Sequence, residues 1–268
     1  MVESTKKQKK EVKDLLKEIL DKNKMQDYLD FYSHHCSKYS MLNTLRIFSQ
    51  RPNATYVAGR KQWREKGRII KPGEVPMILY APKFEWEEVK GRKVKVLKDW
   101  NVIEVFDISQ TTLEAIDPEV SNVKINLSSF NSPNANSLFN HYAEKFGFKV
   151  VILEKEEMEQ RFGAGCTGYI DYNENTAYIQ KAEDLLMLKS LFHEGAHYYL
   201  KHNELNIPKN EREIEAELAA YVCCKYLDLN IENISMPYIA SWINASENKQ
   251  IKYNLERIEK FVKYFSAL

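Results

Sequence analysis

Residues 182–202 read AEDLLMLKSLFHEGAHYYLKH and predict an apolar, buried helix that carries the pattern H-E-x-x-H. Because His193 and His197 are four residues apart, they project from one face of a helix and can bind one Zn²⁺ together. Glu194 lies beside them, where a carboxylate can act as general base on a metal-bound water. The alternative is a pair of core histidines, but burying two imidazoles without partners is costly.

A catalytic zinc site needs a third protein ligand, and the helix predicted over about 211–228 carries glutamates that could supply it. Glu213 and Glu217 are one helical turn apart and share a face, whereas Glu215 points away from both. We expect Glu213 to be the third ligand and Glu217 to orient a ligand histidine, with the reverse assignment left open. Glu213 has a second interpretation, since it stands where a capping-box glutamate would follow Asn210.

The expected reaction is hydrolysis of a peptide bond. Zinc lowers the pKa of its bound water, and Glu194 takes the proton and passes it to the leaving amine. Tyr198, Tyr199 or the backbone around 165–168 could hold the developing oxyanion beside the zinc. His202, near the end of the helix, is expected to be solvated.

The rest of the chain predicts an α+β protein of two domains, residues 1–120 and 121–268, with a polar, turn-rich boundary around 111–135. Either strand of a predicted hairpin, 169–171 or 177–180, could be an edge strand that binds an extended peptide by β-addition. The other expected elements are helices at 8–32, 38–50, 136–147 and 250–266, short β-rich runs between 56 and 106 with a charged hairpin at 84–98, a strand at 149–153, and a Gly-rich stretch at 163–168.

The charges of the two halves differ in sign. Residues 1–110 hold 23 Lys and Arg against 15 Asp and Glu, whereas the remainder holds 16 against 23. Between residues 31 and 80 the balance is 9 to 2. A basic half suggests a polyanionic partner, although a solvated basic surface would have the same composition.

Several motifs resemble known families. HEGAH and the following E-x-E-A-E-L-A-A-Y helix resemble the ImmA/IrrE group of zincin-like metallopeptidases. Over roughly residues 30–265 the chain also resembles the ArdC-type antirestriction proteins of mobile elements. The motifs that carry this second resemblance are Tyr39-Ser40, Asn43, 50–55 (QRPNAT), 57–59 (VAG), Trp63, Gly67-Arg68, 71–74 (KPGE), 105–111 (VFDISQT) and 238–243 (YIASWI).

The ArdC resemblance implies an N-terminal half that binds single-stranded DNA, and the residues support this independently. Cations can follow phosphates while aromatic faces stack on bases, which makes binding tolerant of sequence. Core packing is the alternative for Tyr56 and Trp63. The candidate DNA-binding residues are Tyr39, Arg46, Arg51, Tyr56, Arg60, Lys61, Trp63, Arg64, Lys66, Arg68 and Lys71.

Four cysteines are too few for a disulfide scaffold, and neither a secretory signal nor a membrane-spanning segment is visible, so a cytoplasmic protein without membrane contact is expected. The leading hypothesis is a zinc metallopeptidase that acts on a protein substrate at or near single-stranded DNA and protects transferred DNA. One alternative is a DNA-coating antirestriction protein with a structural or vestigial zinc site. The other is a regulatory protease of the ImmA/IrrE kind that cleaves a repressor.

Overall fold

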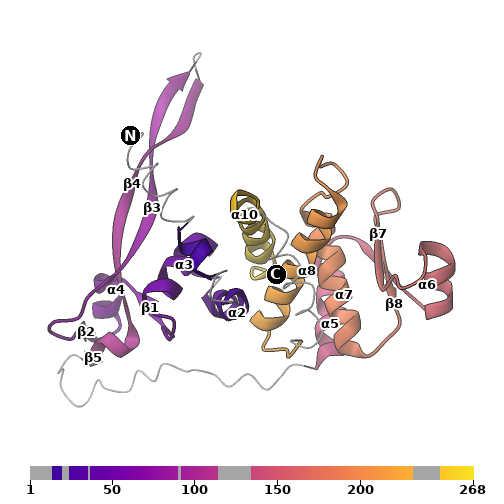
Figure 1. Ribbon diagram of the computed structural model, residues 1–268, viewed down its shortest axis with the longest axis horizontal. Helices are drawn as coiled ribbons and strands as arrows, with labels where there is room; N and C mark the ends of the chain where they lie inside the picture. The colour runs from indigo at the N-terminus through magenta and orange to yellow at the C-terminus, as the bar shows by residue number, and fades with distance from the viewer. Residues whose placement is uncertain (1–13, 20–23, 36, 90–91, 114–133, 232–247) are drawn as a thin grey trace. The chain divides into compact units, whose positions relative to one another are not determined.

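The computed structural model describes residues 14–19, 24–35, 37–89, 92–113, 134–231 and 248–268 (Figure 1). The chain forms two compact units, one of residues 1–31 and 42–128 and the other of residues 32–41 and 129–268. Each unit contains both helices and strands, so the α+β prediction is confirmed. The predicted boundary at 120/121 lies outside the described residues. Among the described residues, no helix is long and apolar enough to cross a membrane.

The first unit is built on a long two-stranded hairpin, β3 (Met77–Val89) and β4 (Arg92–Asp107), with β1 (Val57–Ala58) on the other side of β4. The runs expected as separate short strands and an 84–98 hairpin form one continuous ladder from Met77 to Val105. One extra residue in β4, Lys98, makes a bulge opposite Lys83/Phe84. The other elements are α3 (Met41–Gln50), α4 (Arg60–Glu65), η1 (Ile108–Gln110), and the pair β2 (Arg68–Ile70) and β5 (Thr111–Leu113), while α2 (Met25–His35) is divided between the units.

Asp107, at the end of β4, joins this strand by hydrogen bonds to the segment before β1 and to η1. Its Oδ1 accepts hydrogen bonds from the backbone N–H groups of Thr55 (2.8 Å) and Tyr56 (3.1 Å). Its Oδ2 accepts from the N–H (2.9 Å) and hydroxyl (2.5 Å) of Ser109. Burial alone would raise the pKa of Asp107, but these four bonds outweigh it and hold the pKa below its ordinary value.

The Asp107→Ala variant is expected to lose about 2–4 kcal/mol of unfolding free energy at pH 7, because buried donors lose a charged acceptor. A carboxyl with a depressed folded pKa stabilises above its ordinary pKa of 3.8, and that stability is lost as pH falls further. Urea unfolding across pH should therefore show a constant difference in unfolding free energy between wild type and variant above about pH 5. This difference should narrow below pH 3.8. A gap that widens on acidification would contradict this role for Asp107.

The second unit places a small sheet against helices. The sheet has the order β6–β8–β7, with β6 (Lys149–Leu153) parallel and β7 (Gly168–Asp171) antiparallel to β8 (Thr176–Gln180). The strand predicted at 149–153 is observed with those bounds, whereas α6 (Lys155–Phe162) was not expected. Because β8 is central, β7 is the edge strand of the two predicted candidates.

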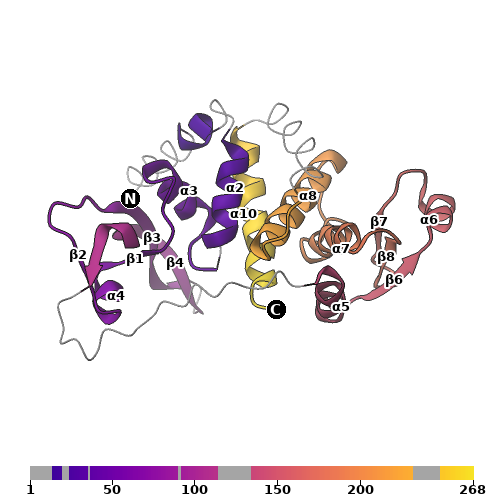
Figure 2. The same cartoon turned by 90° about the horizontal axis from the view of Figure 1, so that it is seen from below.

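The described residues of the second unit also form the helices α5 (Ala135–Lys145), α7 (Asp184–Tyr199), α8 (Lys209–Tyr226) and α10 (Asn248–Phe265). Figure 2 shows α8 between α7 and α10, and α8 packs against both. Gly195 of α7 lets the helix approach Phe146, the residue after α5, since a Cβ there would lie only 3.0 Å from the Phe146 ring. The close contact fixes the helix just where it carries H-E-x-x-H.

Candidate functional site

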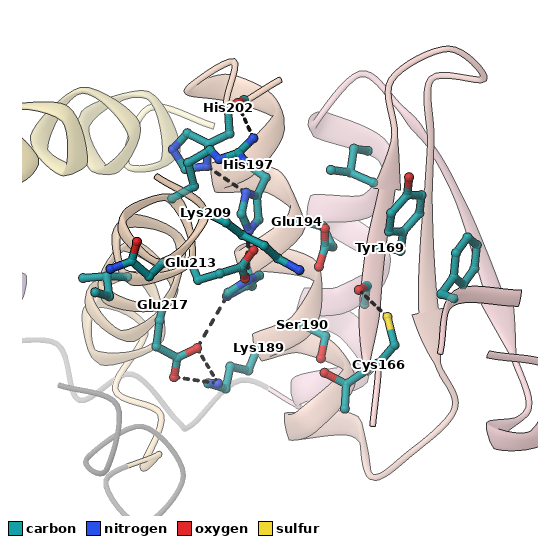
Figure 3. A pocket seen from close by; sticks show the side chains of 18 of the residues that line it. Cys166, Tyr169, Lys189, Ser190, Glu194, His197, His202, Lys209, Glu213 and Glu217 are labelled. Carbon is teal, nitrogen blue, oxygen red and sulfur yellow. Dashed lines mark hydrogen bonds and ion pairs between the residues drawn. The ribbon is translucent and has the colours of Figure 1, made fainter. Parts of the chain in front are cut away.

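The structure brings His193 and His197 of α7 together with Glu213 of α8. Figure 3 shows His197 and Glu213 of this cluster. The two Nε2 atoms are 3.0 Å apart, and Glu213 Oε2 lies 3.4 Å from that of His193 and 3.5 Å from that of His197. A tetrahedral zinc ion with bonds of about 2.0–2.1 Å would hold its ligand atoms roughly 3.3–3.4 Å apart. The triangle therefore has the size that one such ion requires. Among the residues that the structure describes, this is the only such cluster of three His, Cys, Asp or Glu side chains.

Glu217 occupies the outer position that the sequence suggested for it. Its Oε2 lies 3.4 Å from His193 Nδ1, and Lys189 Nζ lies 2.8 Å from both of its oxygens. We assign a proton to His193 Nδ1, where it is donated to Glu217. This orientation aims His193 Nε2 at the triangle, and the ion pair with Lys189 keeps Glu217 in place.

A second network of polar groups lies behind His197, and no sequence motif indicated it. His202 was expected to be solvated, but it is almost fully buried, with Nδ1 2.7 Å from His197 Nδ1. His202 Nε2 lies 3.0 Å from Glu215 Oε2, and Arg257 Nε donates to the same oxygen at 2.7 Å. The expectation was wrong because the turn after α7 folds His202 back under its own helix, where the backbone N–H of His202 donates to the His197 carbonyl.

This polar network determines which ring nitrogen of His197 keeps an available lone pair. A carboxylate only accepts hydrogen bonds, so we assign the His202 proton to Nε2, facing Glu215. The bare Nδ1 of His202 then accepts from His197 Nδ1–H, which leaves His197 Nε2 with a lone pair toward the triangle. Burial lowers the pKa of His202, consistent with a neutral ring. Glu215 points away from Glu213 and Glu217, and its side chain is buried in the interior. Because a buried carboxylate among apolar residues is costly unless it is paired, its position on α8 required a partner.

Glu194 lies buried between α7 and the edge strand β7 (Figure 3). The backbone N–H of Ile170 donates to its carboxylate, and burial raises the pKa of Glu194. A Cβ at Gly168 would come within 2.6 Å of Glu194 Oε1, so glycine is needed at this point of β7. A buried carboxylate with a raised pKa beside a candidate metal cluster has the properties of a general base.

The three charged partners of the cluster shift one another's pKa values. Burial would lower the pKa of His193, but Glu213 and Glu217 outweigh it and raise it to about 9. Hydrogen bonds with His193 and His197 hold the pKa of Glu213 well below its ordinary value. Burial would raise the pKa of Glu217, yet His193 and Lys189 bring it down to about 2. Both carboxylates are therefore ionised at neutral pH and favour a cation between α7 and α8.

A cavity of about 1070 Å³ opens over the cluster, lined by β7, the Gly-rich loop, α7 and α8. Lys209 and Cys166 also line it (Figure 3). Tyr198 and Tyr199, two of the expected oxyanion donors, instead line a separate cavity of about 470 Å³. That expectation was wrong because both point to the side of α7 away from the cluster. The backbone of the Gly-rich loop remains as the predicted donor.

The candidate DNA-binding residues of the first unit separate into buried and exposed groups. Trp63 is 0% exposed, and its Nε1 donates to the Phe106 carbonyl at 3.0 Å. It packs with Ala58 and Phe106, so the prediction that it offers a stacking face is wrong, and core packing is the correct interpretation. Arg46 is only 4% exposed. Its guanidinium is held by the Leu42 carbonyl and by Asn43 Oδ1, which removes it as a phosphate contact.

Other basic residues among the DNA-binding candidates form hydrogen bonds or ion pairs with neighbouring segments. Arg68 donates to Thr111 Oγ1 at 2.6 Å and Lys71 donates to the Ser109 carbonyl at 2.8 Å. Arg51 lies 3.9 Å from Glu74. Tyr56 packs on the edge of Trp63, while Tyr39 belongs to the second unit. The candidates that project from α4 with exposed cationic groups are Arg60, Lys61 and Arg64.

Comparison with known proteins finds a family model that matches the N-terminal part of the chain. Residues 6–110 match the family model described as the N-terminal domain of anti-restriction factor ArdC. An uncharacterized protein of Bacillus anthracis, pXO2-81, is 25% identical over 299 aligned positions, which take in 92% of this chain and 50% of that protein. The chain thus spans about half the length of the curated relative that it matches.

Two crystal structures of the antirestriction protein ArdC from the R388 plasmid have the same fold. The metal-free one superimposes with a TM-score of 0.60 at 13% identity, over 95% of this chain and 96% of that one. The Mn(II)-bound one gives 0.57 at 14%, over 96% and 97%. The chain therefore carries a domain that matches the ArdC N-terminal family over residues 6–110, and it has the fold of the solved ArdC structures.

Proposed function

We propose that the second unit is a divalent-metal-dependent peptidase of the zincin type. The observation that carries the proposal is the triangle of His193 Nε2, His197 Nε2 and Glu213 Oε2, with edges of 3.0–3.5 Å and the buried Glu194 beside it. Two imidazoles and a carboxylate suit zinc and leave one position open for chemistry. A solved ArdC structure of the same fold is Mn(II)-bound, which supports a divalent-metal site in this chain.

When bound, the ion would polarise a peptide carbonyl and make an attacking water more acidic. Glu194 would take the proton of that water, since its carboxylate is fixed by Ile170 N–H and its raised pKa brings it closer to the operating pH. The same carboxyl would then return the proton to the leaving amine. Glu217 and His202 would hold the two histidines in the tautomers that keep Nε2 available.

An extended peptide is the substrate that this site fits best. The edge strand β7 lines the cavity over the cluster, and a peptide could lie along it by β-addition. The residues that close the cavity on the other side come from α8, among them Lys209 and Arg212. A protein segment without stable secondary structure is therefore the expected substrate.

We further propose that the first unit binds single-stranded DNA, so that cleavage occurs on proteins at or near the strand and protects transferred DNA. The match to the ArdC N-terminal domain and the exposed cations of α4 support this. Cations that follow a phosphate backbone give binding that depends on salt and tolerates sequence.

A dye-labelled casein, which has little stable structure, can test for peptidase activity, with Zn²⁺ and with or without an oligo-deoxythymidine. The wild-type chain is expected to release dye. The Glu194→Gln variant is expected to be at least about 100-fold slower, because an amide cannot accept the proton, while still binding the metal. Glu204→Gln, a change on the exposed turn after α7, is the control and should behave as wild type.

Two results would contradict the peptidase. One is an equal rate for wild type and Glu194→Gln. The other combines two observations. Wild-type protein with a full complement of metal does not cleave the substrate, and wild type and Glu194→Gln protect DNA equally in cells. That second outcome would favour a protein that protects DNA by coating it.

A further inference from the structure

The hairpin of β3 and β4 exposes large apolar side chains that its own unit leaves uncovered. Trp86 is 69% exposed and Phe84 45% exposed. Figure 1 shows the distal half of the hairpin extending well beyond α3 and α4 of the same unit. Contiguous exposed aromatic surface on a soluble protein marks a site of interaction.

The aromatic residues of the hairpin gather on one side of it. Tyr80, Phe84 and Trp86 are separated by even numbers of residues on β3, so they face the same way. The bulge at Lys98 lies on β4 and leaves the alternation of β3 unbroken. Trp100 of β4 is in register with the same side, opposite residue 82. We call these four rings, Tyr80, Phe84, Trp86 and Trp100, the aromatic face.

Cations accompany the rings. Lys95 stands directly across from Trp86, and its Nζ lies 4.8 Å from the centre of the Phe84 ring. No carboxylate of the described residues pairs with Lys95, so its charge is available to an anion. At the base of the hairpin, the Arg46 guanidinium lies 4.7 Å from the centre of the Tyr80 ring and braces it.

The acidic residues of the hairpin are placed away from these rings or at the ends of the face. On the opposite side, Lys83 pairs with Glu85 at 3.5 Å, and Lys98 pairs with Glu87. On the aromatic face itself, Glu88 stands near the tip opposite Lys93, and Glu104 stands near the base. The middle of the face therefore offers rings and a cation without a competing carboxylate.

We propose that the aromatic face is a binding surface for single-stranded DNA, with bases stacked on Phe84 and Trp86 and a phosphate near Lys95. The inference rests on the proposed DNA binding of the first unit and gives it a site. A strand rise of roughly 3.3 Å puts alternate rings roughly 6.6 Å apart, about twice the spacing of stacked bases in a duplex. Only a strand whose bases are free to separate can use such a surface.

Fluorescence anisotropy of a labelled oligo-deoxythymidine of about 20 nucleotides, across a salt series, tests this with the full chain. Trp86→Ala and Phe84→Ala are each expected to weaken binding roughly 5- to 150-fold, and Trp86→Phe should recover most of the loss. Lys95→Gln should lower the salt slope by about 0.7. Leu97→Ala is the matched control, because Leu97 is an exposed apolar residue of the same face, opposite Phe84, that has no ring to stack.

The outcomes separate this inference from the proposal on which it rests. If the wild type binds the oligonucleotide and both aromatic variants bind it equally well, the aromatic face is overturned while DNA binding by the first unit stands. If Leu97→Ala weakens binding as much as Phe84→Ala, the contact is apolar docking and stacking is refuted. No binding by the wild type would refute both. Circular dichroism should show that all variants fold, since the replaced side chains are exposed.

Discussion

The wild-type chain is expected to bind one divalent metal ion, and the His197→Ala variant is expected to bind none. The change removes one corner of the triangle and leaves His202 Nδ1, a buried acceptor, without its donor. A ligand that binds only the folded state stabilises it by mass action, by about 2.7 kcal/mol at 100 times its Kd. The thermal midpoint of the wild type should therefore rise with added Zn²⁺, and that of the variant should not.

Metal analysis after dialysis, together with thermal scans, measures both effects. His141→Ala is the control, because His141 is an exposed histidine of the same unit, on α5 and outside the cluster. Full metal content in His197→Ala would exclude this residue as a ligand. Loss of metal in His141→Ala as well would show that the site lies elsewhere or that any change to this unit disrupts it.

The His202→Ala variant is expected to bind metal 10- to 100-fold more weakly, although His202 does not touch the ion position. Without His202, nothing fixes the tautomer of His197, and Glu215 and Arg257 lose a buried partner. In His202→Asn, the side-chain oxygen can occupy the place of Nδ1 and accept from His197. This variant should regain much of the affinity.

Competition with a chromophoric chelator measures the affinities, and a Co²⁺ spectrum reports the geometry of the ligands. A purely structural role for His202 would lower stability in both variants without changing the spectrum of the bound ion. Equal metal affinity in wild type and His202→Ala would contradict the proposed role of His202 in orienting His197.

The pairing of His193 with His197 could be read from the sequence because it depends only on helical spacing. The same holds for Glu213 and Glu217, which a single turn of α8 places on one face. The structure puts Glu213 toward the Nε2 atoms and Glu217 toward His193 Nδ1, while the assignment of Glu213 as ligand stays a prediction. The helical period alone is enough to predict which residues lie together when all of them are on one helix.

Features that depend on tertiary packing were missed. His202 lies in the turn after α7 and Glu215 lies on α8, while Arg257 is 42 residues beyond Glu215, so no local pattern joins them. Trp63 could equally have been a stacking or a core residue, because an amphipathic helix of six residues gives little periodicity. The hairpin was predicted too short because the bulge at Lys98 breaks the period-two alternation along β4.

Anomalous diffraction from crystals grown with Zn²⁺ tests the central claim most directly, since it locates the ion without assuming its ligands. The account predicts one strong peak per chain, at about 2.0–2.2 Å from His193 Nε2, His197 Nε2 and one oxygen of Glu213. Glu217 should stay on His193 Nδ1, with Lys189 on its carboxylate. A peak bonded to Glu217 in place of Glu213, or an ion bound elsewhere with the triangle empty, would contradict it.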